Sequence, residues 1–291
     1  MLHTIENNNL ICTIDSNGAE IRSLIDKSSG EEVIWQMDET IWGSSSPVLF
    51  PAIGKIRANK IIFNGEDFAM TKHGIVRHND NLVFRQYGIS KCAFTLFSSD
   101  ETLLKYPYRF SFTINYSLVE NRLLMEYVIE NLDDIPMQFA CGGHTAYACP
   151  FFENISLTDY IIEFPKKVSL KASTLGATGL LSEVKRSILD NEQFLQLSND
   201  VFNEDALIFE NIDFDWVRLR RKDKPNGIIV KFKGYPNLAI WSKPDADFVC
   251  IEPWLGLPDS ENEPIDITEK TTYQTLQPND KFYIVIETVV E

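Results

Sequence analysis

Alternation of apolar and polar side chains is the main feature of this chain. In segment 110–118 every second residue is apolar: Phe110, Phe112, Ile114, Tyr116 and Leu118. Because successive side chains of a β-strand point to opposite faces, this pattern predicts a half-buried strand. A second alternating run at 123–130 follows the short polar break at 120–121, so the two runs predict a β-hairpin.

Further segments are short, apolar and rich in β-branched or aromatic residues, which favours strands. They lie at 10–14, 60–63, 82–86, 94–97, 156–164, 216–220, 227–232, 238–241, 248–252 and 282–288. Helical periodicity is weak, and the best short candidate is 190–197, where Ser187 could cap the start. Strands that alternate with helices, as in a parallel sheet, are not indicated.

The pattern therefore predicts an all-β protein, a large antiparallel β-sandwich with few short helices. A jelly roll or a propeller would also fit the number of strands, but a propeller should show repeated blade signatures, and we find no fixed-period repeat. Neither a change in composition nor a Gly/Ser linker divides the 291 residues. We expect a single domain over residues 1–291, and we interpret the acidic segment 259–263 as a solvated loop.

Charge and cysteine content narrow the possible functions. The chain has 27 basic and 42 acidic residues and a net charge of −15, which argues against a nucleic-acid partner. The N-terminus lacks the basic and apolar regions of a secretory signal, and the apolar runs are too short for membrane helices. The five cysteines are odd in number and form no C-x-x-C motif, which favours reduced, buried thiols in a cytoplasmic protein.

Two of the four histidines lie in sequence contexts that suit a site. His3 is expected in a frayed terminus. His73 precedes Gly74 and lies four residues before Arg77, so the segment forms either a simple turn or part of a site rim. His144 follows two glycines, which permit the close approach of a ligand or of another chain segment. A packed core histidine is an equal alternative for His144.

Glu252 is the most informative acidic residue. It ends the apolar run 248–251 and precedes Pro253 and Trp254. A carboxylate in this place is partly desolvated, which raises its proton affinity and suits a general base near neutral pH. An ion pair with Lys or Arg is an equal alternative, and Trp254 offers either a flat face for a sugar ring or core packing.

Other chemistries receive less support. The histidine spacings match neither H-x-H nor H-E-x-x-H, so a site without metal is favoured over a metal centre. The chain lacks a G-x-S-x-G elbow, a G-x-G-x-x-G motif and a phosphate loop, which argues against a serine hydrolase and a nucleotide cofactor. We expect a site that uses no cofactor.

Four segments, in order along most of the chain, resemble motifs of a known family. FPAIGK at 50–55 resembles Pro-x-x-Gly-Arg, and HGIVR at 73–77 resembles H-G-F-x-R. GGHTAY at 142–147 resembles G-G-H-P-A-F, and IEPW at 251–254 resembles the C-terminal E-P-W. Together they resemble the aldose 1-epimerase (galactose mutarotase-like) family, in particular its bacterial LacX-like branch.

The resemblance implies a supersandwich with a sugar on one concave sheet, and interconversion of the α and β anomers of an aldohexose. In this reading Glu252 takes the proton of the anomeric hydroxyl and His144 protonates the ring oxygen. The ring opens and recloses on the other face, which needs one acid and one base but no cofactor. We therefore expect a small sugar as the binding partner, and we expect binding to neither nucleic acid nor membranes. We expect a monomer or a homodimer.

The substrate-binding residues implied by the resemblance are His73, Arg77, Asp205 and Lys55. Asp205 is the weakest match, because a loop or capping acid is equally compatible. Lys55 replaces the family's Arg, and this exchanges a planar, two-pronged donor for a point charge. Ile75 and Thr145 also depart from the family pattern.

Three alternatives stay open. The sequence cluster of Lys55, Arg57, Lys72 and Arg77 leaves room for a hexose-6-phosphate 1-epimerase. A non-catalytic carbohydrate-binding protein would keep the fold and the site. A metal-dependent sugar isomerase is a third, less favoured alternative.

Overall fold

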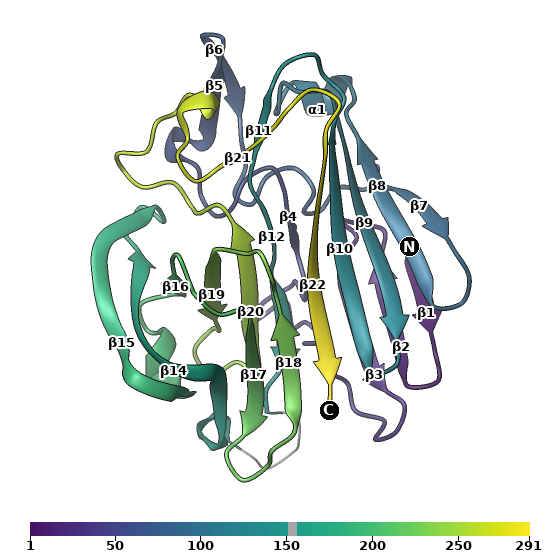
Figure 1. Ribbon diagram of the computed structural model, residues 1–291, viewed down its shortest axis with the longest axis vertical. Helices are drawn as coiled ribbons and strands as arrows, with labels where there is room; N and C mark the ends of the chain where they lie inside the picture. Colours follow the sequence, from purple (N-terminus) through teal and green to yellow (C-terminus); the bar gives the residue numbers. More distant parts are fainter. Residues whose placement is uncertain (151–155) are drawn as a thin grey trace.

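The computed structural model describes residues 1–150 and 156–291. A 15-stranded, mainly antiparallel sheet dominates this part of the chain (Figure 1). Its main path runs through β4 (Val48–Leu49), β12 (Cys141–Gly143), β20 (Phe248–Leu255), β19 (Asn237–Trp241), β16 (Leu207–Phe209), β14 (Tyr160–Leu175), β17 (Trp216–Arg221), β18 (Gly227–Lys231), β22 (Lys281–Val290), β10 (Arg122–Asn131), β9 (Phe110–Val119), β8 (Lys91–Phe97) and β7 (Val83–Gln86). Two more strands join it, β13 (Thr145–Ala148) beside β20 and β15 (Leu181–Gln196) beside β14.

Smaller elements complete the described fold. A three-stranded sheet contains β1 (Leu2–Glu6), β2 (Leu10–Asp15) and β3 (Ile21–Asp26). Two-stranded sheets pair β5 (Lys60–Phe63) with β6 (Glu66–Ala69) and β11 (Met137–Phe139) with β21 (Gln274–Leu276). The helices are α1 (Asp100–Leu103) and short 3-10 turns at Arg57–Asn59, Leu157–Asp159, Asn199–Phe202 and Ile267–Glu269. None of these described helices has the length and apolarity needed to cross a membrane.

The predicted hairpin is confirmed by β9 and β10, which pair in register from Arg122 opposite Val119 to Asn131 opposite Phe110. The alternating apolar side chains of β9 are buried in the core. The β12 and β13 segment packs face to face on β10 and β22, since Tyr147 and Thr288 hydroxyls lie 2.7 Å apart. The Tyr127 hydroxyl also donates to the Gly142 carbonyl at 3.3 Å. Two parts of one curled sheet thus cover a common core, and the predicted β-sandwich is confirmed.

All ten further strand predictions coincide with strands, most of them within a few residues at each end. In the 156–164 segment the strand begins only at Tyr160, after a 3-10 turn whose first amides are capped by Ser156. The predicted helix at 190–197 is wrong, because residues 190–196 belong to β15, which pairs with β14. Register shifts and a positive φ at Asn191 interrupt the alternation in this long edge strand. The irregular spacing resembled a helical period.

Two other expectations are corrected. His3 is not in a frayed end, because it lies in β1 and stacks on Phe84 with ring centroids 3.6 Å apart. The 259–263 segment is not wholly solvated, because Asp259 is buried in an ion pair with Lys270. The expectation of buried, reduced thiols agrees with the structure, in which all five cysteines are free and buried.

Candidate active site

The strand register places His144 opposite Glu252. Gly142 of β12 pairs with Trp254 of β20, and Thr145 of β13 pairs with Ile251 of the same strand. Continuing this register by one position sets residue 144 against residue 252, at the short gap between β12 and β13. Side chains directly opposite one another on neighbouring strands lie close together. Antiparallel pairing therefore brings together two residues that are far apart in sequence.

Period-two alternation decides which face of the sheet carries the pair. Gly143 and Tyr147 point into the core, so His144 points to the other face. A Cβ added to Gly143 would lie 2.7 Å from Ile286 of β22, so the glycine is needed for this close packing. Ala239 lies opposite Glu252 on β19 and places only a methyl group beside the carboxylate. The site thus lies on the sheet face opposite the core.

The His144–Glu252 pair is compact and buried. The His144 Nε2 and Glu252 Oε2 atoms lie 3.3 Å apart, and both side chains are buried. Burial raises the pKa of Glu252 well above its usual range, and the charge of Asp205 adds to this effect, while Lys72, Arg77 and Trp254 oppose it. Burial and the charge of Arg77 lower the pKa of His144 to about 3. Burial therefore favours the uncharged form of each of the two side chains.

His73 is fixed beside this pair by the backbone of Gly54. The ring Nδ1 of His73 accepts a hydrogen bond from the Gly54 N–H at 3.2 Å. The backbone N–H of His73 donates to the Gly54 carbonyl at 2.9 Å. The rings of His73 and His144 are perpendicular, with centroids 5.5 Å apart. Burial, together with the charges of His144, Lys72 and Arg77, holds the pKa of His73 well below its usual range. The neutral ring therefore carries its proton on Nε2, which is free to act as a donor.

Arg77 is held near the pair by residues that the sequence reasoning missed. Its Nη2 donates to the Ser44 hydroxyl at 3.3 Å. The buried Glu20 carboxylate accepts hydrogen bonds from the Ser45 and Ser46 amides and also pairs with Arg22 at 3.2 Å. Burial lowers the pKa of Arg77, while the nearby carboxylates Glu20 and Glu252 raise it. Glu20 lies next to the Gly18–Ala19 turn and carries no motif, so the sequence offered no signal for it.

Aromatic side chains wall the pair. Trp42 stacks on His144 with centroids 5.2 Å apart, and Trp241 meets His144 edge-on at 5.7 Å. Both indoles also contact Phe248. Trp241 could have been found from sequence, because it shares a face with Ala239 on a predicted strand. Trp42 lies in an irregular segment, where alternation gives no information.

The other predicted residues lie at different places around the pair. Asp205 is exposed and has a positive φ, and its charge acts on Glu252. Lys55 does not point its ammonium at the pair, because Nζ donates to the Thr178 carbonyl at 2.6 Å. Lys72 is exposed, and its charge acts on His73, His144 and Glu252. Of the sequence cluster of cations, Lys72 and Arg77 act on the pair, whereas Arg57 donates to the Glu263 carbonyl.

Cys250 is a neighbour of the pair that the sequence reasoning did not select. It lies two positions before Glu252 in β20 and therefore shares its face. The potential ligand atoms of His144, Cys250 and Glu252 lie within 4.8 Å of one another. This arrangement was not foreseen from the histidine spacing, because it depends on pairing between strands.

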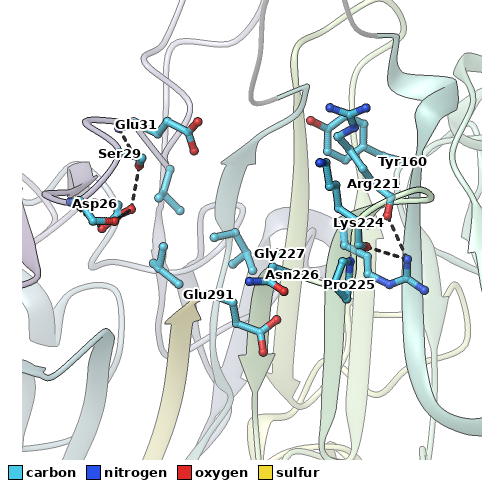
Figure 2. Close-up of a pocket in the computed structure, with 15 residues that line it drawn as sticks. Asp26, Ser29, Glu31, Tyr160, Arg221, Lys224, Pro225, Asn226, Gly227 and Glu291 are labelled. Atoms are coloured by element: carbon cyan, nitrogen blue, oxygen red, sulfur yellow. Dashed lines mark hydrogen bonds between the residues drawn. The ribbon is translucent and has the colours of Figure 1, made fainter.

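A separate cavity of about 710 Å³ lies between the turn after β3 and the β17–β18 hairpin. Figure 2 shows Asp26 and Glu31 on one side of it and Arg221 and Lys224 on the other. None of the residues that line it is a histidine or one of the predicted site residues. The residues that the sequence predicted for acid–base chemistry therefore lie outside this cavity.

Comparisons with known proteins agree with the fold and with the family that the four motifs resemble. The aldose 1-epimerase family profile matches residues 1–283. The chain is 29% identical over 288 residues to the chromosomal protein LacX of Lactococcus lactis subsp. lactis, covering 95% of this chain and 96% of that one.

Two solved structures are closely similar. A galactose mutarotase related enzyme from Lactobacillus acidophilus has a TM-score of 0.94 at 29% identity, covering 100% of this chain and 97% of the other. A galactose mutarotase-like protein from Lactobacillus casei has a TM-score of 0.92 at 28% identity, with 100% of both chains covered. The chain therefore belongs to the aldose 1-epimerase family, and this membership supports the function of a carbohydrate epimerase.

Proposed function

We propose that this protein is a mutarotase that interconverts the α and β anomers of an aldohexose. The observation that carries the proposal is the His144–Glu252 pair, an acid and a base 3.3 Å apart on a sheet face walled by tryptophans. Anomer exchange requires one proton donor and one proton acceptor at a hemiacetal, and little else. The two groups fit these roles without any further reactant.

The proton balance of the reaction matches the pair. With sugar bound, Glu252 takes the anomeric hydroxyl proton while His144 gives a proton to the ring oxygen, and the bond between C1 and the ring oxygen breaks. The pair thereby passes from the ionic form to the neutral form, which burial favours. Rotation about the C1–C2 bond and the reverse proton transfers close the ring on either face. Throughout the cycle the pair holds one mobile proton.

The neighbouring groups suit the binding of sugar hydroxyls. We propose that the His73 Nε2–H and the Arg77 guanidinium donate to sugar oxygens, and that Asp205 accepts from a hydroxyl at the rim. Stacking of Trp42 and Trp241 around His144 gives apolar surface for the sugar ring. For Lys55, substrate binding stays a prediction, because its ammonium donates to Thr178 in this structure.

Glu252→Gln tests the proposal. The amide keeps the shape of the side chain but does not accept the proton, so we expect anomer exchange to fall about 100-fold to 10,000-fold while sugar affinity is retained. NMR saturation exchange measures the rate, and calorimetric titration measures affinity. Glu192→Gln, at an exposed position on β15, serves as the matched control and should exchange anomers as the native protein does.

The panel should contain glucose, galactose and their 6-phosphates. Exchange no faster than in buffer with every sugar would contradict the enzyme, and retained sugar binding in that case would identify a non-catalytic carbohydrate-binding protein. Measuring both quantities separates the two functions.

A hexose-6-phosphate 1-epimerase is the second candidate, and one observation favours it. Within the described residues the Lys72 ammonium makes no hydrogen bond or ion pair, although its charge reaches the pair. A free cation beside a sugar site is suited to a phosphate group. The strongly acidic protein around it opposes an anionic substrate, so we favour the neutral aldose.

A further inference from the structure

We propose that His144, Cys250 and Glu252 form a binding site for a thiophilic divalent cation, Zn²⁺, on the face where the sugar would bind. Neither the motifs nor the family membership assigns a role to Cys250. The inference rests on the convergence of three different donor atoms, an imidazole nitrogen, a thiol sulfur and a carboxylate oxygen.

The strand geometry explains why the three donors meet. Cys250 and Glu252 are two residues apart on β20 and project from the same face. His144 lies across the neighbouring ladder, with its Nε2 already 3.3 Å from Glu252 Oε2. All three ligand atoms lie within 4.8 Å of one another. Tetrahedral zinc holds its ligand atoms about 3.3–3.8 Å apart, so a movement of about 1 Å completes the site.

The donor set selects the class of metal. Sulfur and imidazole ligands favour zinc and similar soft or borderline cations, whereas magnesium and calcium prefer oxygen ligands. Three protein ligands leave the fourth tetrahedral position for water or another small ligand. Selection by sulfur therefore predicts zinc binding and no magnesium binding at this position.

The charges of the ligands are also compatible with a cation. Zinc binds the thiolate of Cys250 and the carboxylate of Glu252, whose protons pass to the solvent, and His144 binds as the neutral imidazole. The two anionic ligands neutralise the divalent cation, so the buried site acquires no net charge. Ala146 pairs with Cys250 and Ala239 pairs with Glu252, so the neighbouring positions on the two flanking strands carry only methyl groups.

Metal binding would compete with the proposed chemistry, and this part of the inference rests on the proposed function. The cation would bind to the same lone pairs of His144 and Glu252 that carry protons during anomer exchange. Zinc should therefore inhibit anomer exchange, and sugar should protect against zinc. Cys250 takes no part in the proton transfers, which allows the two activities to be separated by mutation.

The binding test uses the purified full-length protein with a reductant that does not chelate metal. Zinc is titrated in competition with a chromophoric chelator, and cobalt is used as a spectroscopic substitute, with Mg²⁺ as the control cation. We expect one equivalent of zinc, a thiolate-to-cobalt charge-transfer band, and no response to Mg²⁺.

Cys250→Ser should weaken zinc binding by at least about 100-fold and remove the charge-transfer band, because losing even an outer-shell partner of a metal ligand costs about 10-fold to 100-fold. Cys141→Ser is the matched control, since Cys141 is buried in the same sheet on the core face. If the serine variant does not fold, Cys250→Ala replaces it. Failure of the native protein to bind zinc, or equal binding by the Cys250 and Cys141 variants, would overturn the site.

The inhibition test adds zinc to the anomer-exchange assay. Native protein and Cys141→Ser should lose exchange, while Cys250→Ser should keep exchange and tolerate about 100-fold more zinc. Zinc binding that leaves anomer exchange unchanged would contradict the proposed competition between zinc and sugar. If metal-free protein exchanges no anomers, the proposed function fails, but the binding and cobalt spectra still decide the metal site.

Discussion

Glu252 and His144 respond to burial in opposite directions, and each contributes to the pH dependence of stability. The folded pKa of His144 is lowered from 6.5 to about 3, so the unfolded chain binds the extra proton between these values and stability falls as pH falls. The folded pKa of Glu252 is raised well above 4.5, so the folded protein holds the extra proton and stability falls as pH rises toward that pKa. From about pH 4.5 upward the contribution of Glu252 to stability falls as pH rises, whereas the contribution of His144 rises with pH until about pH 6.5.

Glu252→Gln should therefore change how the stability of the protein depends on pH. The amide does not ionise, so the variant should gain stability relative to the native protein as pH rises above about 4.5, by at most about 1.4 kcal/mol per pH unit. Thermal unfolding from pH 4.5 to pH 9 measures the difference. Glu192→Gln removes the same charge at an exposed position and should show a constant offset. A constant offset for Glu252→Gln as well would contradict the raised pKa.

At the level of residues, the sequence identified the candidate site residues that lie within motifs. His73, His144 and Glu252 were selected from their neighbours, and the structure brings them together. Glu20 and Trp42 were missed because they meet the site only through folding of an irregular segment. Cys250 was missed because its relation to His144 depends on strand pairing, which the sequence alone does not give.

At the level of elements, the loop after β20 supports the segment that fixes His73. Lys270 Nζ donates to both Asp259 carboxylate oxygens at 2.7 Å, and both side chains are almost fully buried. Asp259 Oδ2 also accepts from the Arg57 amide at 2.9 Å. Pro258 packs so closely on Gly54 that an added Cβ would lie 2.5 Å from it. The buried ion pair thus holds the backbone whose amide orients His73.

Lys270→Met should leave the Asp259 carboxylate buried and unpaired. We expect a loss of about 3–5 kcal/mol in the free energy of unfolding, measured by urea denaturation. The double variant Asp259→Asn with Lys270→Met should lose less, since it removes the uncompensated charge. Lys166→Met breaks an exposed ion pair with Asp213 and should cost less than about 1 kcal/mol. Equal costs for the two lysines would contradict the structural role of Lys270.

Elements with regular alternation were predictable, and the others were not. In the β9–β10 hairpin, the apolar residues of one face are buried in the core, so the alternation in the sequence predicts both strands. The β14–β15 pair is long, polar and interrupted by register shifts, so its alternation is lost. The order of strands in the large sheet depends on long-range pairing, for which one sequence contains no signal.

At the level of the whole molecule, the net charge of −15 makes the ionic-strength dependence informative. The field extends about 30 Å at 10 mM salt but about 8 Å at 150 mM. For a neutral aldose, kcat/KM should stay nearly constant between these conditions. For a hexose 6-phosphate it should rise with salt, because screening weakens the repulsion from the protein. NMR exchange at both salt concentrations measures this, and a fall with salt would instead favour a phosphosugar substrate held by Lys72 and Arg77.

The register that sets His144 against Glu252 also has a consequence for folding kinetics. The contact exists only after β13 has docked on β20, which closes a long loop of chain containing the β14–β15 arm. Closing such a loop has an entropic cost before any contact compensates it, and sheets built from distant segments fold slowly. During refolding, the time at which anomer exchange first appears would therefore report when β13 docks on β20.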